Sequence, residues 1–166
     1  MQTPFYDQHV SSGAKILDFH GWEMPLQYSG IIDEHKNARS NVGLFDVSHM
    51  GRFKITGTSA ENCLQNLLTN NVSKIGDLQA IYSPMCSESG GILDDVIAYR
   101  INKDDFLMVV NSSNIEKDFA WIASHNQSAH VENITDQMAL LALQGPASQE
   151  VLKAAELDLG ELKRFH

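Results

Sequence analysis

Two adjacent aspartates, Asp94 and Asp95, begin an otherwise apolar stretch in the segment SGGILDDVIAYR at 89–100. Burial of a charged side chain costs free energy unless a partner compensates it, so two carboxylates at the start of a core strand require an explanation. The pair is compatible with a solvated strand end, with a metal site, or with a carboxylate that acts on a substrate.

The alternation of a β-strand separates the two carboxylates. If 92–101 is a strand, one face carries Leu93, Asp95, Ile97, Tyr99 and Ile101, and the other carries Ile92, Asp94, Val96, Ala98 and Arg100. The first face is the more apolar, and Asp95 is its only charged residue. We therefore expect Asp94 to reach water or a cation on the face of Arg100, and Asp95 to be the carboxylate in an unusual environment.

A hairpin would bring a tyrosine to Asp95. With a four-residue loop at 88–91 and an unbroken register, Pro84 opposes Asp95 and Tyr82 opposes Ile97. Tyr82 then lies one diagonal step from Asp95 on the same face, within side-chain reach. A carboxylate beside a phenol on an apolar surface is suited to form the floor of a site for a flat, polar ligand.

Two other interpretations of the aspartates remain open at this point. Asp95 can accept hydrogen bonds from backbone amides at the end of the hairpin, as aspartates near turns commonly do. A metal site is disfavoured, because neighbouring side chains on a strand diverge and no histidine lies near the pair in the sequence. We therefore predict no metal ligands.

The pattern along the chain predicts interleaved helices and strands. Helices are expected at 33–43, with Gly43 as the C-terminal cap, after two capping boxes at 58–61 and 113–116, and after Pro146. Strands are expected at 51–57, 80–87, 92–101, 106–111 and 138–146. Consecutive strands with short connections pair antiparallel, so the predicted class is α+β, with antiparallel sheets and flanking helices.

Composition limits the class of function. The 166 residues are 43% hydrophobic and 20% charged, as in a soluble globular protein of one domain or part of a larger one, and the net charge of -9 argues against nucleic acid and anionic membranes as partners. We expect no signal peptide and no membrane span, because no apolar run approaches the roughly 20 residues that a span requires. Cys63 and Cys86 have no metal-like spacing, which favours a reducing compartment, the cytoplasm.

Five segments in order resemble the T protein of the glycine cleavage system, the aminomethyltransferase family. They are TPFYDQHVSSGAKILDFHGWEMPLQY at 3–28, GLFDVSHMG at 43–51, SGGILDD at 89–95, VVNSSNIEKD at 109–118 and LALQGP at 141–146. The resemblance implies transfer of a one-carbon unit from the aminomethyl-lipoyl arm of the H protein to tetrahydrofolate, with release of ammonia. It implies the folate-binding fold of that family, of which 1–166 would be an N-terminal portion.

The resemblance also assigns residues. The family's key carboxylate is the second aspartate of its Gly-Gly-Ile-x-Asp-Asp segment, which falls on Asp95, the residue that the strand pattern singles out independently. The folate site further draws on Met50, on Tyr82, and on a valine of the following strand, Val110 or its immediate neighbour. Asn111 and Asn114 are expected to bond backbone groups. A later Gly-Tyr-Thr-Gly-Glu segment and an arginine, which the family also uses, are absent from 1–166, so we expect this chain to be inactive by itself.

Two other functions are compatible with the same resemblance. One is the folate domain of an enzyme similar to dimethylglycine or sarcosine oxidase, which normally follows a flavin domain. The other is a non-catalytic folate-binding accessory protein of the same superfamily. The close GLFDVSHMG and GGILDD matches favour the aminomethyltransferase.

Overall fold

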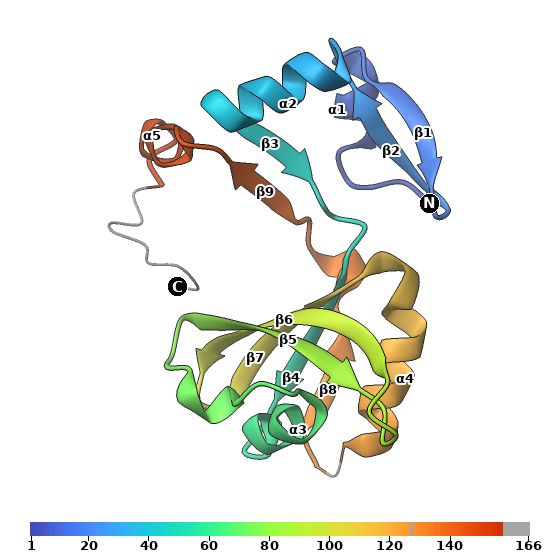
Figure 1. Ribbon diagram of the computed structural model, residues 1–166, viewed down its shortest axis with the longest axis vertical. Helices are drawn as coiled ribbons and strands as arrows, with labels where there is room; N and C mark the ends of the chain where they lie inside the picture. Colours follow the sequence, from blue (N-terminus) through green and yellow to red (C-terminus); the bar gives the residue numbers. More distant parts are fainter. Residues whose placement is uncertain (127, 158–166) are drawn as a thin grey trace. The chain divides into compact units, whose positions relative to one another are not determined.

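A computed structural model describes residues 1–126 and 128–157, which cluster into two compact units (Figure 1). Within the described residues, the first unit comprises 1–49 and 138–157, and the second comprises 50–126 and 128–137. Asp95 and the other predicted site residues all belong to the second unit, so this unit is described first.

The second unit is built on a five-stranded antiparallel sheet with the strand order β5-β6-β7-β4-β8. Its strands are β4 (Gly51–Thr56), β5 (Gln79–Cys86), β6 (Ile92–Asn102), β7 (Asp105–Val110) and β8 (His130–Asn133). Its helices are α3 (Ala60–Leu67) and α4 (Ile115–His125), with short 3-10 turns at Val72–Lys74, Ser112–Asn114 and Thr135–Gln137. The fold class and the four strands expected in this region are confirmed.

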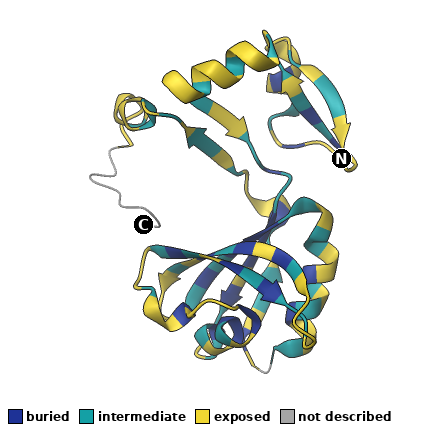
Figure 2. Cartoon of the chain, viewed as in Figure 1, coloured by how far each residue is buried: buried dark blue, intermediate teal, exposed yellow. Residues whose placement is uncertain are grey.

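One face of this sheet forms the hydrophobic core. Strand residues such as Phe53, Val96 and Met108 pack with Leu64 of α3 and Ile122 of α4, and all five are almost completely inaccessible to solvent. Buried and accessible positions alternate along β6, as Figure 2 shows by colour. The opposite face of β5 and β6 is therefore the accessible one, and the candidate site lies there.

Close packing at the start of β4 requires a glycine. A Cβ atom on Gly51 would lie 2.5 Å from a methyl group of Val110 and 2.7 Å from the side chain of Ile115. Both distances are far below van der Waals contact, so no larger residue fits at position 51 without displacing its neighbours. Gly51 thus lets the first turn of α4 pack against β4 and β7, close to the segment that carries Asn111 and Asn114.

The first unit consists of two small antiparallel sheets and three helices. The hairpin of β1 (Lys15–Phe19) and β2 (Trp22–Gln27) forms one sheet, and β3 (Gly43–Asp46) pairs with β9 (Leu141–Gln144) in the other. The helices are α1 (Tyr6–Ser11), α2 (Ile31–Ser40) and α5 (Ser148–Ala154). The strand expected at 138–146 is thus shorter than predicted, and the helix after Pro146 is present.

Three predicted helix ends differ from the structure. Gly43 lies in β3 instead of capping α2, and a Cβ atom there would lie only 2.9 Å from the ring of Phe45. Neither capping box forms. The Glu61 carboxylate bonds instead to Arg100 at 2.8 Å, and the Asn114 side chain, at the N-cap of α4, bonds to Asp94.

Candidate functional site

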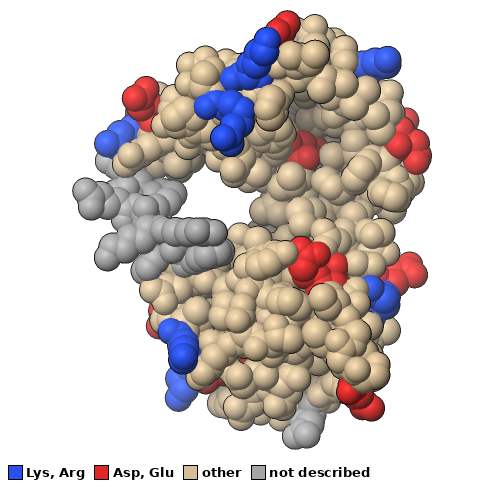
Figure 3. Space-filling view, viewed as in Figure 1, with Lys and Arg blue, Asp and Glu red and all other residues tan. Residues whose placement is uncertain are grey.

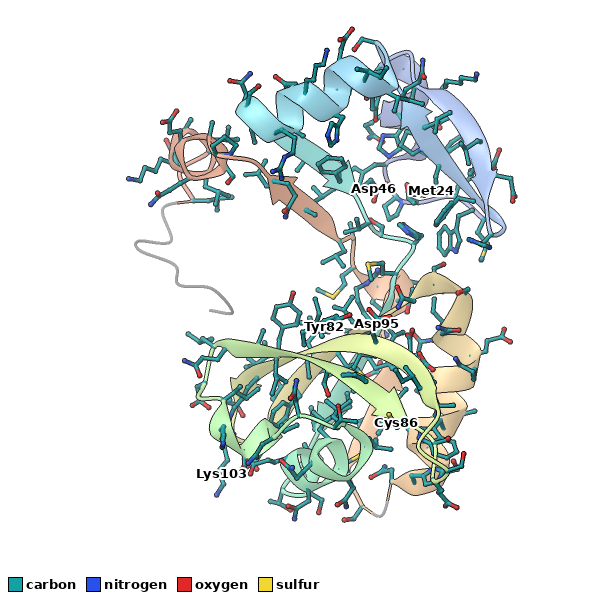
Figure 4. The ribbon with its side chains drawn as sticks, viewed as in Figure 1. Met24, Asp46, Tyr82, Cys86, Asp95 and Lys103 are labelled. Atoms are coloured by element: carbon teal, nitrogen blue, oxygen red, sulfur yellow. The ribbon has the colours of Figure 1, made fainter. Side chains whose placement is uncertain are left out.

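Tyr82 and Asp95 form a direct hydrogen bond on the accessible face of the β5–β6 hairpin. The Tyr82 hydroxyl donates to Oδ2 of Asp95 at 2.6 Å, and Figure 4 shows the two side chains together on one side of the hairpin. Pro84 opposes Asp95 and Tyr82 opposes Ile97 as expected. The register is not unbroken, however, because a bulge next to Cys86 pairs Cys86 with Ile92.

The expectation for the environments of the two aspartates is wrong. Asp94 is only 4% exposed and lies on the core face with Val96 and Ala98, whereas Asp95 is on the exposed face with Tyr99. Counting apolar residues along the strand misassigned the faces, because two large apolar residues of the Asp95 face, Tyr99 and Ile101, remain exposed in this chain. Asp94 and Asp95 do point in opposite directions, as predicted.

Hydrogen bonds compensate the burial of Asp94. Its carboxylate accepts from the backbone N–H of Asn111 at 3.0 Å, from Asn111 Nδ2 at 2.8 Å and from Asn114 Nδ2 at 2.7 Å. Burial by itself raises the pKa of Asp94, but these bonds, together with one from Asp118, hold the pKa below its usual value. Asp94 is therefore a buried carboxylate stabilised by its neighbours. The expectation of a backbone partner is confirmed for Asn111, which also donates to the Asp95 carbonyl oxygen, and is wrong for Asn114, which donates to the Asp94 carboxylate.

Asn111 connects the buried aspartate to the exposed one. Its Nδ2 group donates to Asp94, and it also lies 3.2 Å from Oδ1 of Asp95 and 3.2 Å from the Asp95 carbonyl oxygen. The two oxygens of the Asp95 carboxylate thus receive donors from two different segments: Oδ2 from Tyr82 and Oδ1 from Asn111. This arrangement holds the carboxylate in one orientation on an otherwise accessible surface.

Asp118, in the first turn of α4, adds a second buried carboxyl group behind Asp94. It is completely inaccessible to solvent. Burial, the hydrogen bond to Asp94 and the negative charge of Asp94 raise the pKa of Asp118 to about 8, and nearby Lys117 only partly opposes this. Asp118 is accordingly a neutral acid at pH 7. The sequence offered no sign of its role, because position 118 reads as an ordinary helix residue.

The other two predicted site residues, Met50 and Val110, lie in different environments. Met50 is half-buried and immediately precedes β4, and its carbonyl oxygen accepts a hydrogen bond from Arg52. Val110 is completely buried in the core, on the face opposite Asp95, because it continues the alternation that places Met108 in the core. Its neighbour Val109 opposes Ile97 and so shares the face of Asp95. The structure therefore does not bring the Val110 side chain to the candidate site.

The accessible face combines a fixed charge with flat apolar surface. Tyr82 is 47% exposed and Tyr99 39% exposed, on either side of the half-buried Ile97. The hydrogen bond to the Asp95 carboxylate raises the pKa of the Tyr82 phenol, so Tyr82 remains a neutral donor at physiological pH. Such a surface can stack an aromatic ring system while the carboxylate stabilises or orients a positively charged or N–H-bearing group.

The first unit contains a cavity of about 370 Å³ of its own. Tyr28, Glu34 and Asp46 contribute to its wall. His9 links two of them, because its Nδ1 lies 2.7 Å from the Tyr28 hydroxyl and its Nε2 lies 2.9 Å from Oδ2 of Asp46. Burial acts to raise the pKa of Asp46, but hydrogen bonds from His9 and Ser48 lower it overall. This cluster satisfies buried polar groups of the first unit.

The described residues carry scattered charges and no cluster of metal-ligating side chains. Figure 3 shows acidic and basic side chains in small separate groups on a mostly uncharged surface. Among residues 1–126 and 128–157, no group of three or more His, Cys, Asp or Glu side chains is arranged to hold a metal ion. Within the same residues, no helix is both long enough and apolar enough to cross a membrane.

Comparison with known proteins places the chain in a family. The model of the GCVT N-terminal domain matches residues 5–165. Aminomethyltransferase from Desulfitobacterium hafniense is 48% identical over 99% of this chain and 46% of its own length, and that from Thermotoga sp. strain RQ2 is 51% identical over 92% of this chain and 42% of its own length. The chain thus spans less than half the length of these relatives.

Solved structures agree with this assignment. The glycine cleavage system aminomethyltransferase T from Bartonella henselae superimposes with a TM-score of 0.94 at 36% identity, over 99% of this chain and 46% of that one. Heterotetrameric sarcosine oxidase from Corynebacterium sp. U-96 has a TM-score of 0.50 at 14% identity, which shows a related fold only. The chain belongs to the GCVT N-terminal domain family and is the counterpart of part of an aminomethyltransferase.

Proposed function

We propose that this chain supplies the catalytic carboxylate and one wall of the folate site of a glycine cleavage aminomethyltransferase. The observation that carries the proposal is the Tyr82–Asp95 hydrogen bond on an accessible, partly aromatic sheet face. The relatives that match nearly the whole chain are named aminomethyltransferases, which supports this reaction class. The proposed substrates are the aminomethyl-lipoyl group of the H protein and tetrahydrofolate, and the proposed location is the cytoplasm.

The proposed reaction exchanges two bonds at one carbon. The aminomethyl carbon loses its bonds to the lipoyl sulfur and to the amino nitrogen, and it forms bonds to two nitrogens of tetrahydrofolate. The two protons that these nitrogens lose end on the lipoyl sulfur and on the released ammonia. The products are 5,10-methylenetetrahydrofolate, ammonia and the dihydrolipoyl H protein, so no oxidant is consumed. Positive charge develops on the carbon as its bond to sulfur breaks, which is the charge that an aligned carboxylate stabilises.

Asp95 is suited to this role because its carboxylate is held from both sides. The Tyr82 hydroxyl bonds one oxygen and the Asn111 amide bonds the other, and each oxygen keeps a further lone pair with which to accept a hydrogen bond. A carboxylate in a fixed orientation can hold an attacking N–H group in line with the reacting carbon and offset its developing charge.

The pterin ring of tetrahydrofolate fits the apolar part of the same face. Tyr82 and Tyr99 present aromatic surface, Ile97 lies between them, and Val109 lies opposite Ile97 on the next strand. Flat heterocycles gain affinity from such surfaces when a few polar groups fix their orientation. Met50 is the further side chain that we propose for this wall. Val109 shares the face of Asp95 but is only 5% exposed, so we propose that it supports Ile97 in place of Val110.

The test is an assay of the complete gene product with tetrahydrofolate and an H protein that carries the aminomethyl-lipoyl group. We expect 5,10-methylenetetrahydrofolate and ammonia in equal amounts. An H protein without its lipoyl group serves as the control and should give neither product. Tight binding of tetrahydrofolate without any turnover would contradict the proposal and would favour a non-catalytic folate-binding protein.

A further inference from the structure

A carboxylate lies on the core face of β6, where an apolar side chain would be expected. Asp94 is 4% exposed and shares this face with Val96 and Ala98, which both belong to the hydrophobic core. A charged side chain is costly in such a place unless hydrogen bonds compensate it, whereas an apolar residue carries no such cost. Core packing therefore does not account for a carboxylate at position 94.

Three hydrogen bonds from one short segment hold the Asp94 carboxylate. Its Oδ2 accepts from the backbone N–H of Asn111 at 3.0 Å, and its Oδ1 accepts from Asn111 Nδ2 at 2.8 Å and from Asn114 Nδ2 at 2.7 Å. Asn111 directly follows β7, and Asn114 is the N-cap residue of α4. Because Asp94 bonds both the backbone and the side chain of Asn111, it fixes the position of this residue and the direction of its amide.

The charge of Asp94 determines which end of the Asn111 amide faces Asp95. An asparagine amide has a donating nitrogen and an accepting oxygen, and they exchange places when the group turns over. In the structure the nitrogen lies 2.8 Å from Asp94 Oδ1 and 3.2 Å from both Oδ1 and the carbonyl oxygen of Asp95. If the amide turned over, its oxygen would face two carboxylates and the bonds to both would be lost.

Of the two carboxylates, Asp94 has the greater hold on this amide. Its bond to Asn111 Nδ2 is the shorter one, and it is largely shielded from water, which strengthens a charged hydrogen bond. Asp95 is exposed, so water screens its charge and competes for its oxygens. The buried aspartate therefore orients the amide, and the amide in turn bonds the exposed aspartate.

We propose that Asp94 is a positioning residue for one-carbon transfer, because its buried carboxylate fixes the Asn111 amide and, through it, one oxygen of the Asp95 carboxylate. Asp94 faces the core, away from Asp95 and the proposed folate wall, so it acts through Asn111 and touches no substrate. The effect on rate rests on the proposed function, whereas the link from Asp94 to Asp95 does not. If Asp94 served only to stabilise the fold, loss of either asparagine partner would have the same consequences.

Asn111 and Asn114 provide a matched pair of donors for the test. Both side chains bond the same oxygen of Asp94, and within the described residues Asn111 is the one of the two that also contacts Asp95. Asn111→Ala and Asn114→Ala thus remove similar support from Asp94 and differ in their effect on Asp95. Asp94→Ala removes the shared acceptor, and a double variant with Asp94→Ala and Asn111→Ala completes a mutant cycle.

The rate assay uses the complete gene product with tetrahydrofolate and aminomethyl-lipoyl H protein. We expect Asp94→Ala and Asn111→Ala each to lower kcat roughly 10- to 100-fold with KM for tetrahydrofolate nearly unchanged, because a misplaced catalytic group affects the chemical step. The double variant should lose no more than the slower single variant, because Asp94 acts through Asn111. Asn114→Ala should keep kcat within about threefold of the wild type, since the Asn111 amide stays in place. Urea unfolding confirms that each variant is folded and that the two asparagine variants lose similar stability.

A second readout does not depend on activity. The side-chain amide protons of Asn111 are identified by NMR as the pair of signals that is missing from Asn111→Ala. In Asp94→Ala these protons should exchange with water at least about tenfold faster than in the wild type, whereas in Asn114→Ala they should exchange at nearly the wild-type rate.

Three results would overturn the inference: an equal loss of kcat in Asn111→Ala and Asn114→Ala, additive losses in the double variant, or unchanged Asn111 exchange in folded Asp94→Ala. If Asp94→Ala does not fold, the comparison of Asn111→Ala with Asn114→Ala decides alone. If the wild type transfers no one-carbon unit, the proposed function fails, and the exchange of the Asn111 amide protons then tests the positioning role separately.

Discussion

The Tyr82 hydroxyl donates a 2.6 Å hydrogen bond to Oδ2 of Asp95 across neighbouring strands of one hairpin. The two residues are not directly opposed, since Pro84 faces Asp95 and Ile97 faces Tyr82. They meet along the diagonal of the pleated surface, where long side chains from adjacent strands can reach one another. This contact joins the proposed charge-stabilising group to the aromatic surface proposed for the pterin ring.

Replacement of Asp95 by asparagine should abolish most of the activity and leave the fold intact. Asn matches Asp in size and can still accept a hydrogen bond from Tyr82, but a neutral amide cannot stabilise a developing cation. We expect the rate of 5,10-methylenetetrahydrofolate formation to fall by about 10²–10³, as is typical for loss of one aligned electrostatic group. Asp136→Asn, at an exposed aspartate of the same unit, is the control and should leave the rate unchanged. Full activity of folded Asp95→Asn would contradict the assigned role.

The ionisation of Tyr82 should report the charge of Asp95. The hydrogen bond to the carboxylate is the main reason that the pKa of Tyr82 is raised. In Asp95→Asn that pKa should move down toward the ordinary value for tyrosine, because the phenolate no longer faces a negative charge. A pH titration of the ¹³Cζ resonance of Tyr82 measures the change, with Tyr99 as an internal reference. An identical Tyr82 titration in both proteins would mean that the bond does not persist in solution.

Asp94→Asn should destabilise the second unit, whereas the same substitution at an exposed aspartate should not. The Asp94 carboxylate accepts from Asn111 and Asn114, so an amide at position 94 would place a donor against donors. The expected loss in free energy of unfolding is about 1–3 kcal/mol, the usual cost of an unsatisfied buried polar group. Urea unfolding of the two variants measures it, with Asp136→Asn again as the control. Equal stability of Asp94→Asn and the wild type would argue against the buried network.

Asp118 should make stability depend on pH in a direction opposite to that of most aspartates. Its pKa in the folded state is about 8, above the value of about 3.9 for an unfolded chain. Between these values the folded state binds the extra proton, so the free energy of unfolding from this group falls as pH rises. Asp118→Asn cannot titrate, and its stability relative to the wild type should therefore increase between pH 4 and 8, by at most about 1.4 kcal/mol per pH unit.

Urea unfolding of both proteins across this pH range provides the measurement. Glu116→Gln, which changes an exposed acid in the same helix turn, is the control. Its stability relative to the wild type should not show this trend. Parallel stability curves for Asp118→Asn and the wild type would show that Asp118 is ionised in the folded protein throughout the range.

His9→Phe should destabilise the first unit specifically. The substitution leaves the Asp46 carboxylate, whose side chain is 1% exposed, without its bond from the imidazole. Loss of a hydrogen-bond partner from a buried polar group costs about 1–3 kcal/mol. The pKa of Asp46 is lowered in the folded state, so its contribution is present near neutral pH and is lost as pH falls below about 4. Amide hydrogen exchange, measured separately for the residues of each unit, reports the effect. His35→Phe, at an exposed histidine of the same unit, is the control. Equal protection of the first unit in His9→Phe and His35→Phe would contradict the prediction.

Local sequence patterns were sufficient to predict much of the structure of the second unit. The alternation along 92–101 and the short loop before it predicted the β5–β6 hairpin, the Pro84–Asp95 pairing and the meeting of Tyr82 with Asp95. These features follow from the two-residue period of a strand and from hairpin closure, both of which act over a few neighbouring residues. Short segments such as β3 and β8 escaped prediction, because their pairing partners β9 and β4 are far away in the sequence.

Only the tertiary structure decided which face of the hairpin is buried. The sequence alone determined that Asp94 and Asp95 point apart and that Asp95 shares a face with Tyr82. It could not show that α3 and α4 cover the face of Asp94, that Val110 belongs to the core, or that Asp118 approaches Asp94 from a helix later in the chain. The burial of a side chain and its hydrogen-bond partners depend on residues that are distant in sequence. The composition of a single strand therefore does not reveal which elements pack against it.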